Sequence, residues 1–179
     1  MIIKGLMEPN SRMNINLVNA DYVAKQQGLV FTEECKSDRE ESDESFSKDS
    51  LESIHVKIAQ VESKFARALP SDSDEIAFEG ELKHGCTPFL SKVGSFDVDI
   101  SLDGRLILVG HLDQPGMIAK VLSVLEEDNV GINFMIVTAR KTSSKQALMA
   151  IKVEDEPSVA ALQRIEGIQG VEGVMFVNL

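Results

Sequence analysis

The sequence predicts an α+β protein, with a small mixed α/β domain followed by a βαββαβ ferredoxin-like domain. From residue 105 onward, apolar runs with strand alternation and with helical spacing follow in the order strand, helix, strand, strand, helix, strand. Before residue 102, short alternating runs are separated by glycine-containing turns, which is typical of a small sheet. The excess of acidic over basic residues is also smaller after residue 102 than before it. We therefore predict domains over residues 1–102 and 103–179.

The composition and net charge of the chain exclude some classes of binding partner. The 179 residues are 43% hydrophobic, enough for a packed core, and carry a formal net charge of −11. This charge repels nucleic acid and anionic membranes at long range, so we expect neither as a partner. Cys35 and Cys86 lie far apart without a CxxC pattern, which indicates neither a metal site nor a disulfide framework.

No membrane or targeting pattern is evident. No apolar run approaches the roughly 20 residues that span a bilayer, and residues 1–20 lack the patterns of a secretory signal or transit peptide. From these patterns we expect a soluble, intracellular protein whose given sequence carries no targeting signal.

The first domain begins with a predicted helix. Asn19 suits its N-cap, the amphipathic run ends at Gln27, and Gly28 stops it before a predicted strand over Leu29–Thr32. Residues 33–52 then contain nine acidic residues and five serines around one phenylalanine. Such a segment buries too little apolar surface to offset the entropy of ordering, so we predict a disordered acidic insertion.

A series of strands completes the first domain. Strict alternation over residues 53–61 places Ile54, Val56, Ile58 and Val61 on one face of a half-buried strand. Further strands are predicted at residues 75–83, 89–93 and 95–101, with turns at 84–85, 94 and 102–104.

The second domain shows the more regular pattern. Residues 105–111 form a strand, the Pro115-Gly116 pair breaks it, and a helix follows with an apolar face that ends at an acidic stop, residues 126–128. Strands at 131–140 and 146–153, a helix opened by Pro157 and a strand at 171–177 complete the motif. In this motif two helices cover one face of the sheet, and the apolar residues on the other face predict association.

A candidate ligand site lies where the first strand of this domain ends. His111, Asp113 and the start of the following helix come together there. Helix N-terminal N–H groups suit a carboxylate, and Asp113 suits an ammonium, which are the two ends of a free amino acid. Asn133 begins the next strand, beside the same edge of the predicted sheet, and can both donate and accept. The alternative is that Asp113 only caps the helix and His111 is a surface residue.

A family resemblance extends this interpretation. The segment GHLDQPGMIAKVLSVLEEDNVGINFM resembles the opening of an ACT domain, an amino-acid-sensing module with the βαββαβ fold. Upstream, the segments MIIKGLMEP, NLVNADYVAKQQGL, VESKFA and PFLSKVGSFDVDISLDGRLIL resemble the C-terminal region of plant-type D-3-phosphoglycerate dehydrogenase, including its allosteric substrate-binding domain. Apart from the acidic insertion, the resemblance covers the chain. It implies regulation of NAD-dependent 3-phosphoglycerate oxidation, the first committed step of serine synthesis, by L-serine bound between paired ACT domains.

The resemblance also implies roles for individual residues. His111 and Asp113 match ligand-binding positions, and Asn133 matches an asparagine that reaches the ligand from the neighbouring subunit. Lys92 matches a basic anion-binding position of the upstream domain, whose usual arginine partner falls at Ser101 in this sequence. The implied partners are L-serine or a related amino acid, and a second copy that pairs through the ACT domain to form a homodimer. The implied location is the plastid, if the chain follows the plant-type enzyme.

The catalytic half of such an enzyme is not recognisable in the sequence. No GxGxxG turn joins a strand to a helix, since the glycines of residues 167–173 enter a terminal strand. Neither His55 nor His84 has an evident carboxylate partner. We expect no NAD or other cofactor in this chain, no phosphoglycerate oxidation by the chain alone, and a first domain that is only partial.

The main prediction is therefore a regulatory, amino-acid-binding region. One alternative is a subunit that completes a catalytic site with another chain, as in iron–sulfur serine dehydratases. Clustered cysteines in the sequence would favour this alternative. A free-standing amino-acid sensor is another, and the sequence alone does not separate it from the regulatory region.

Overall fold

The computed structural model describes residues 15–16, 18–26, 28–30, 32, 53–59, 63–69, 75–83, 87–140 and 145–179. The chain divides into two compact units, residues 1–46 and 47–179. The predicted acidic insertion, 33–52, lies outside the described residues. Within the described part of the chain, no helix has the length and hydrophobicity needed to cross a membrane.

The described part of the first unit contains helix α2, Ala20–Gln26, which confirms the predicted helix. The strand predicted at Leu29–Thr32 is wrong for its described residues 29, 30 and 32, which lie outside any strand. Instead, the N–H of Leu29 donates to the carbonyl of Ala24 at 3.0 Å, after Gly28 turns the chain with φ +80°. The N–H of Leu29 is therefore bonded at the helix end and cannot pair with a neighbouring strand.

An antiparallel sheet begins the second unit. Its strand order is β1-β2-β3-β4, and every pairing is antiparallel. The strands are β1 Ser53–Ala59, β2 Glu75–Lys83, β3 Thr87–Val93 and β4 Phe96–Ser101. All four strands were predicted. Between β1 and β2 lies the short helix α3, Lys64–Ala68, whose N-cap Ser63 accepts from the N–H of Ala66 at 2.9 Å.

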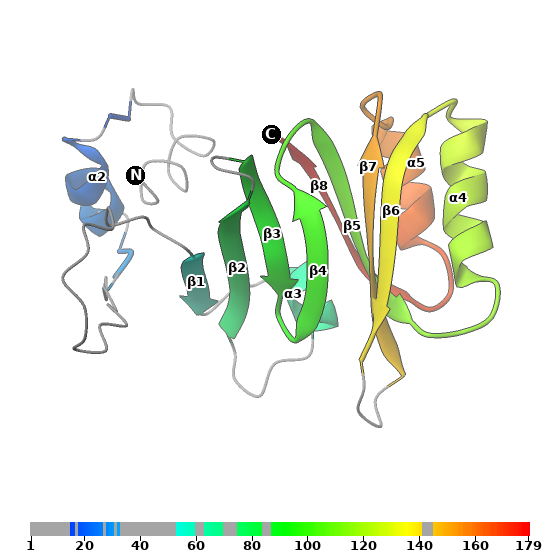
Figure 1. Cartoon of the computed structure of the whole chain (residues 1–179), viewed down its shortest axis with the longest axis horizontal. Helices are drawn as coiled ribbons and strands as arrows, with labels where there is room; N and C mark the ends of the chain where they lie inside the picture. Colours follow the sequence, from blue (N-terminus) through cyan, green and yellow to red (C-terminus); the bar gives the residue numbers. More distant parts are fainter. Residues whose placement is uncertain are drawn as a thin grey trace, which may run out of the picture. The chain divides into compact units, whose positions relative to one another are not determined.

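The predicted βαββαβ motif follows in the same unit and is confirmed (Figure 1). Its sheet has the order β6-β7-β5-β8, and its pairings are antiparallel. The elements are β5 Arg105–Leu112, α4 Met117–Glu127, β6 Ile132–Ala139, β7 Gln146–Val153, α5 Val159–Glu166 and β8 Val171–Asn178. On one face, Ile107 and Val109 of β5 pack with buried residues of α4 and α5 in one core.

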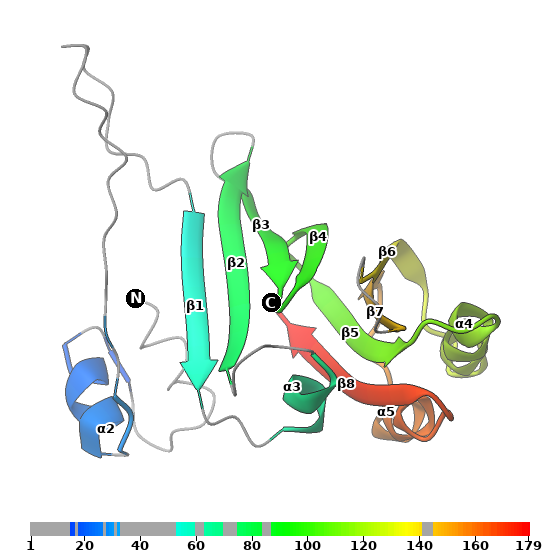
Figure 2. The ribbon, with the colours of Figure 1, turned by 90° about the horizontal axis from the view of Figure 1, so that it is seen from below.

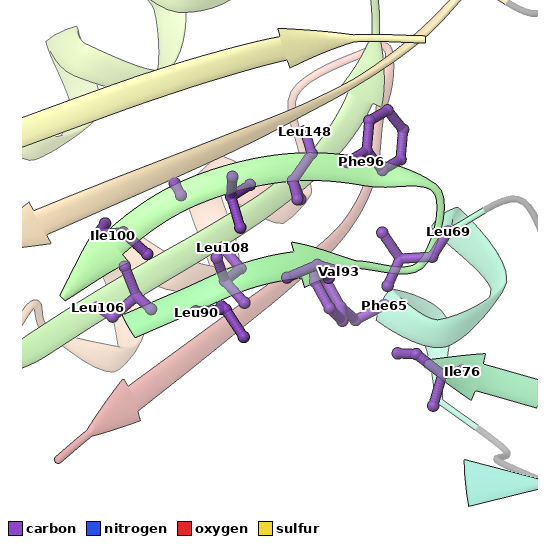
Figure 3. Packing of buried hydrophobic residues seen from close by; sticks show 12 residues of the cluster. Phe65, Leu69, Ile76, Leu90, Val93, Phe96, Ile100, Leu106, Leu108 and Leu148 are labelled. Carbon is purple, nitrogen blue, oxygen red and sulfur yellow. The ribbon is translucent and has the colours of Figure 1, made fainter. Parts of the chain in front are cut away.

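The other face of this sheet is covered by the same chain, contrary to the expectation that it needs a partner. Leu106, Leu108 and Leu148 belong to a core that also contains side chains of the first sheet and of α3. Those side chains are Phe65, Leu69, Ile76, Leu90, Val93, Phe96, Val98 and Ile100. Figure 2 shows α4 and α5 on one side of the sheet and β4 on the other, and Figure 3 shows the side chains between the two sheets. The apolar residues on both faces of β5 and β7 are therefore explained within one molecule.

The predicted domain boundary at residues 102–103 falls in the turn between β4 and β5. The shared core means that the two sheets of the second unit pack directly against each other. The boundary itself stays a prediction.

One carboxylate connects the two helices of the βαββαβ motif. Asp128, the C-cap of α4, accepts hydrogen bonds from the N–H of Ser158 at 2.7 Å and from its hydroxyl at 2.8 Å. Ser158 is in turn the N-cap of α5 and accepts from the N–H of Ala161 at 3.1 Å. The backbone hydrogen bond from Ser158, together with its hydroxyl, lowers the pKa of Asp128 below the ordinary value of 3.8.

We predict that Asp128→Ala lowers the midpoint of thermal unfolding, because Ser158 loses both hydrogen bonds. A carboxylate whose pKa is lowered in the folded state stabilises the protein above its unfolded pKa, and this contribution is lost as the pH falls through the folded pKa. The difference between wild type and variant should therefore shrink below pH 3.8. In Asp128→Asn, the amide oxygen still accepts but does not titrate, so this acid-dependent loss should vanish. A wild-type advantage over Asp128→Ala that stays constant through the acid range would contradict the prediction.

Candidate functional site

The loop after β5 begins helix α4 without a side-chain cap. Gly116 is the N-cap, with φ +85°, and no side chain accepts a hydrogen bond there. The alternative that Asp113 only caps the helix is therefore wrong. Asp113 is exposed, and its backbone N–H donates to the carbonyl of Lys145 at 2.7 Å, which holds the loop in place. The loop that carries Asp113 thus leads into a helix N-terminus that no side chain caps.

His111 is buried, with 2% of the residue exposed, so the alternative that it is a surface residue is also wrong. Strand alternation places it on the same face of β5 as Val109, toward the helices. Its Nδ1 lies 2.8 Å from the carbonyl oxygen of Leu112. Because a carbonyl oxygen can only accept, Nδ1 carries the proton, and in the neutral ring Nε2 is then an acceptor. Nε2 is buried and has no hydrogen-bond partner among the described residues.

Asn133 lies at the opposite end of the sheet, contrary to the expectation that it shares an edge with His111. It occupies the bulge of β6 opposite Lys152 of β7, and Lys152 pairs with Leu106 of β5. His111 pairs instead with Ala147. At about 3.3 Å per residue, these two positions on β5 are roughly 17 Å apart. The sequence-based placement missed that β5 and β6 run in the same direction on either side of β7, so the start of one does not meet the end of the other.

Lys92, the predicted anion-binding position, is surrounded by carboxylates. Its Nζ lies 3.6 Å from an oxygen of Glu79 and 3.8 Å from an oxygen of Asp97. Glu79 also lies 3.6 Å from Nδ1 of His55, so the expectation that His55 lacks a carboxylate partner is wrong. These charged groups form a row across β1–β4, with 45% of the Lys92 side chain exposed. An incoming anion would compete with two resident carboxylates, and anion binding at Lys92 stays a prediction. His84 lies outside the described residues.

The sequence patterns did not predict a cavity of about 300 Å³ between the ends of the two sheets, which has both apolar and charged residues in its lining. Lys152 and Arg105 line it, together with Asp103, Ser101 and Asn133. The only signal in the sequence was a lysine within the apolar run ALMAIKV, because a charged residue there must find a partner when the strand is buried. Spacing alone did not indicate that residues 101–105 would supply that partner.

No protein-family model matches the chain, but it is similar to part of several D-3-phosphoglycerate dehydrogenases. It is 49% identical over all its 179 residues to D-3-phosphoglycerate dehydrogenase 3, chloroplastic, from Arabidopsis thaliana, of which it covers 29%. It is 48% identical to D-3-phosphoglycerate dehydrogenase 2, chloroplastic, from the same plant, of which it covers 27%. It is also 24% identical to D-3-phosphoglycerate dehydrogenase from Methanocaldococcus jannaschii, with 99% of the chain and 30% of that protein aligned.

A solved structure, the ligand-free regulatory subunit of aspartate kinase from Thermus thermophilus, overlaps 42% of this chain and 51% of that chain. Its identity is 26% and its TM-score 0.35, an overlap too loose to indicate a function. The sequence relatives carry the assignment: over its whole length, the chain matches the C-terminal region of the D-3-phosphoglycerate dehydrogenases, the plant-type enzymes at 49% identity.

Proposed function

We propose that this chain is an amino-acid-sensing regulatory region that binds L-serine, within a parent enzyme that oxidises 3-phosphoglycerate with NAD. The match to D-3-phosphoglycerate dehydrogenases supports the parent activity, and the chain spans about 29% of the length of the first of these relatives. The observation that carries ligand binding is the buried Nε2 of His111, an acceptor without a partner among the described residues, at the end of β5 that leads to α4.

The groups at this end of β5 complement the parts of L-serine. The N–H groups of the first turn of α4 suit the ligand carboxylate, because no side chain caps them. The exposed carboxylate of Asp113 suits the ammonium. Nε2 of His111 can accept a hydrogen bond from the serine hydroxyl, which relieves the cost of a buried, unpaired acceptor.

A second copy of the chain would supply Asn133. Within one chain this residue is roughly 17 Å along the strand from His111, so both can contact one ligand only across an interface between copies. Strand β6 is an edge of its sheet, and Ile132 and Phe134 on it are 40% and 45% exposed. An unpaired edge with exposed apolar residues favours a homodimer that pairs through the βαββαβ motif.

Calorimetric titration with L-serine, L-alanine and glycine tests this function, with the oligomeric state followed by light scattering. We expect L-serine to bind to the dimer and to bind more weakly on dilution into monomers. L-Alanine should bind more weakly than L-serine, because it lacks the hydroxyl that pairs with His111. If the dimer binds none of these amino acids, the proposal fails. A chain that stays monomeric at high micromolar concentration would contradict the shared site.

A further inference from the structure

Two cationic side chains line the cavity between the two sheets, at the end opposite to His111 and Asp113. Lys152 contributes Nζ, and 15% of its side chain is exposed. Arg105 contributes a guanidinium whose Nη1 donates to the carbonyl of Glu154. Its Nε is buried and has no hydrogen-bond partner among the described residues. Two cations beside a cavity of about 300 Å³ are the groups that would bind a small oxyanion.

One of these cations already has an anionic partner from the same chain. Nζ of Lys152 lies 2.7 Å from a carboxylate oxygen of Asp103 and 2.8 Å from the hydroxyl of Ser101. The hydrogen bonds from Lys152 and then from Ser101 lower the pKa of Asp103. Lys152 therefore donates to both groups, and its ammonium joins the Ser101 hydroxyl and the Asp103 carboxylate in one network.

Arg105 has no such partner. Among the described residues, no carboxylate lies within ion-pair distance of its guanidinium, and the other acid that lines the cavity, Asp99, lies 2.8 Å from Lys83. Because Asp103 neutralises the charge of Lys152, Arg105 is left as a cation of the cavity lining without a carboxylate partner among the described residues. The cavity therefore lacks a second free cation that could bind an external anion together with Arg105.

We propose that Asp103 is the resident anion of this cavity, and that it keeps Lys152 and Ser101 from binding a small external oxyanion such as phosphate. Its carboxylate occupies the donors that a phosphate oxygen would use, and its charge repels the incoming anion. Removing this charge converts the cavity into an oxyanion site formed by Lys152, Ser101 and Arg105. Asn133, which belongs to the proposed amino-acid site, also lines this cavity. The inference rests instead on the contacts of Asp103 with Lys152 and Ser101, and it does not depend on serine binding.

Titration of the full chain with inorganic phosphate tests the proposal in wild type and in Asp103→Asn. Asparagine keeps the shape of the side chain and is favoured in turns such as the one over residues 102–104, so the variant should fold. We expect phosphate to bind Asp103→Asn at least about tenfold more tightly than wild type, because a charge-assisted hydrogen bond becomes available. The double variant Asp103→Asn with Lys152→Gln should lose this gain.

Asp99→Asn is the matched control, since it removes the same charge from the same cavity but leaves Lys152 paired with Asp103. Its own partner, Lys83, keeps a second carboxylate, Glu81, at 3.7 Å. The phosphate affinity of Asp99→Asn should stay within about threefold of wild type, well under the tenfold difference that 1.4 kcal/mol represents. Circular dichroism and thermal unfolding verify that each variant is folded. The proposal is overturned if Asp103→Asn and wild type bind phosphate equally, including the case in which neither binds. It is also overturned if Asp99→Asn gains as much affinity as Asp103→Asn.

Discussion

Replacing Gly173 with alanine should destabilise the second unit by about 1–3 kcal/mol, the usual cost of overpacking a core. Gly173 lies on β8, directly under helix α3, and a Cβ at this position would be 2.6 Å from Cα of Phe65 and 2.8 Å from its backbone nitrogen. Backbone atoms cannot rotate away as a side chain can, so α3 would have to move off the sheet. Because α3 carries Phe65 and Leu69 into the core between the sheets, its movement would also disturb that core. Chemical denaturation measures the loss.

Gly167→Ala provides the control, because the new Cβ would meet only carbonyl oxygens at 3.4 Å and the residue already has an ordinary helical conformation. Its stability should stay within about 0.5 kcal/mol of wild type. Gly110→Ala tests the same contact from β5, where the Cβ would lie 2.9 Å from Cβ of Ala68. Adding Ala68→Gly should recover part of that loss, since it removes the clashing atom. Equal stability of Gly173→Ala and Gly167→Ala would show that α3 does not pack as closely as described.

The second large effect is expected at the proposed amino-acid site. Asp113→Ala should weaken L-serine binding about ten- to a hundredfold, because the ligand ammonium loses a charge-assisted hydrogen bond of roughly 1.5–3 kcal/mol. Calorimetric titration measures the change. Asp155→Ala removes another exposed carboxylate outside this loop and should leave the affinity unchanged. Unchanged serine affinity in Asp113→Ala would remove this residue from the site.

Mixing two variants that each bind serine weakly tests the contribution of the second copy. If each site combines Asp113 of one copy with Asn133 of the other, a mixed dimer of Asp113→Ala and Asn133→Ala has one intact site and one doubly altered site. Mixing the two proteins should therefore restore part of the binding stoichiometry with wild-type affinity. Failure of the mixture to bind, when the mixed dimer is shown to form, would contradict a site shared between copies.

Local patterns in the sequence were enough to predict most of the fold. Alternation predicted β1, and the spacing of apolar residues after Gly116 predicted α4, because burial on one face imposes a period that depends only on the type of element. The strand at Leu29–Thr32 was wrong because an apolar run also fits a helix end whose N–H groups turn back to the helix. The apolar residues on both faces of β5 and β7 looked like evidence for association, because the sequence does not show which segment of the chain covers each face.

The sequence by itself determined the order of elements in the βαββαβ motif and the residue types of the proposed amino-acid site, since both are local properties of the chain. Only the tertiary structure decided which residues meet. It covered the second face of that sheet with the first sheet and α3, buried His111, and separated Asn133 from it along the strands. It also brought Asp103 to Lys152, 49 positions away. The physical reason is that strand register and sheet packing depend on contacts between distant segments, and no periodicity within one segment encodes them.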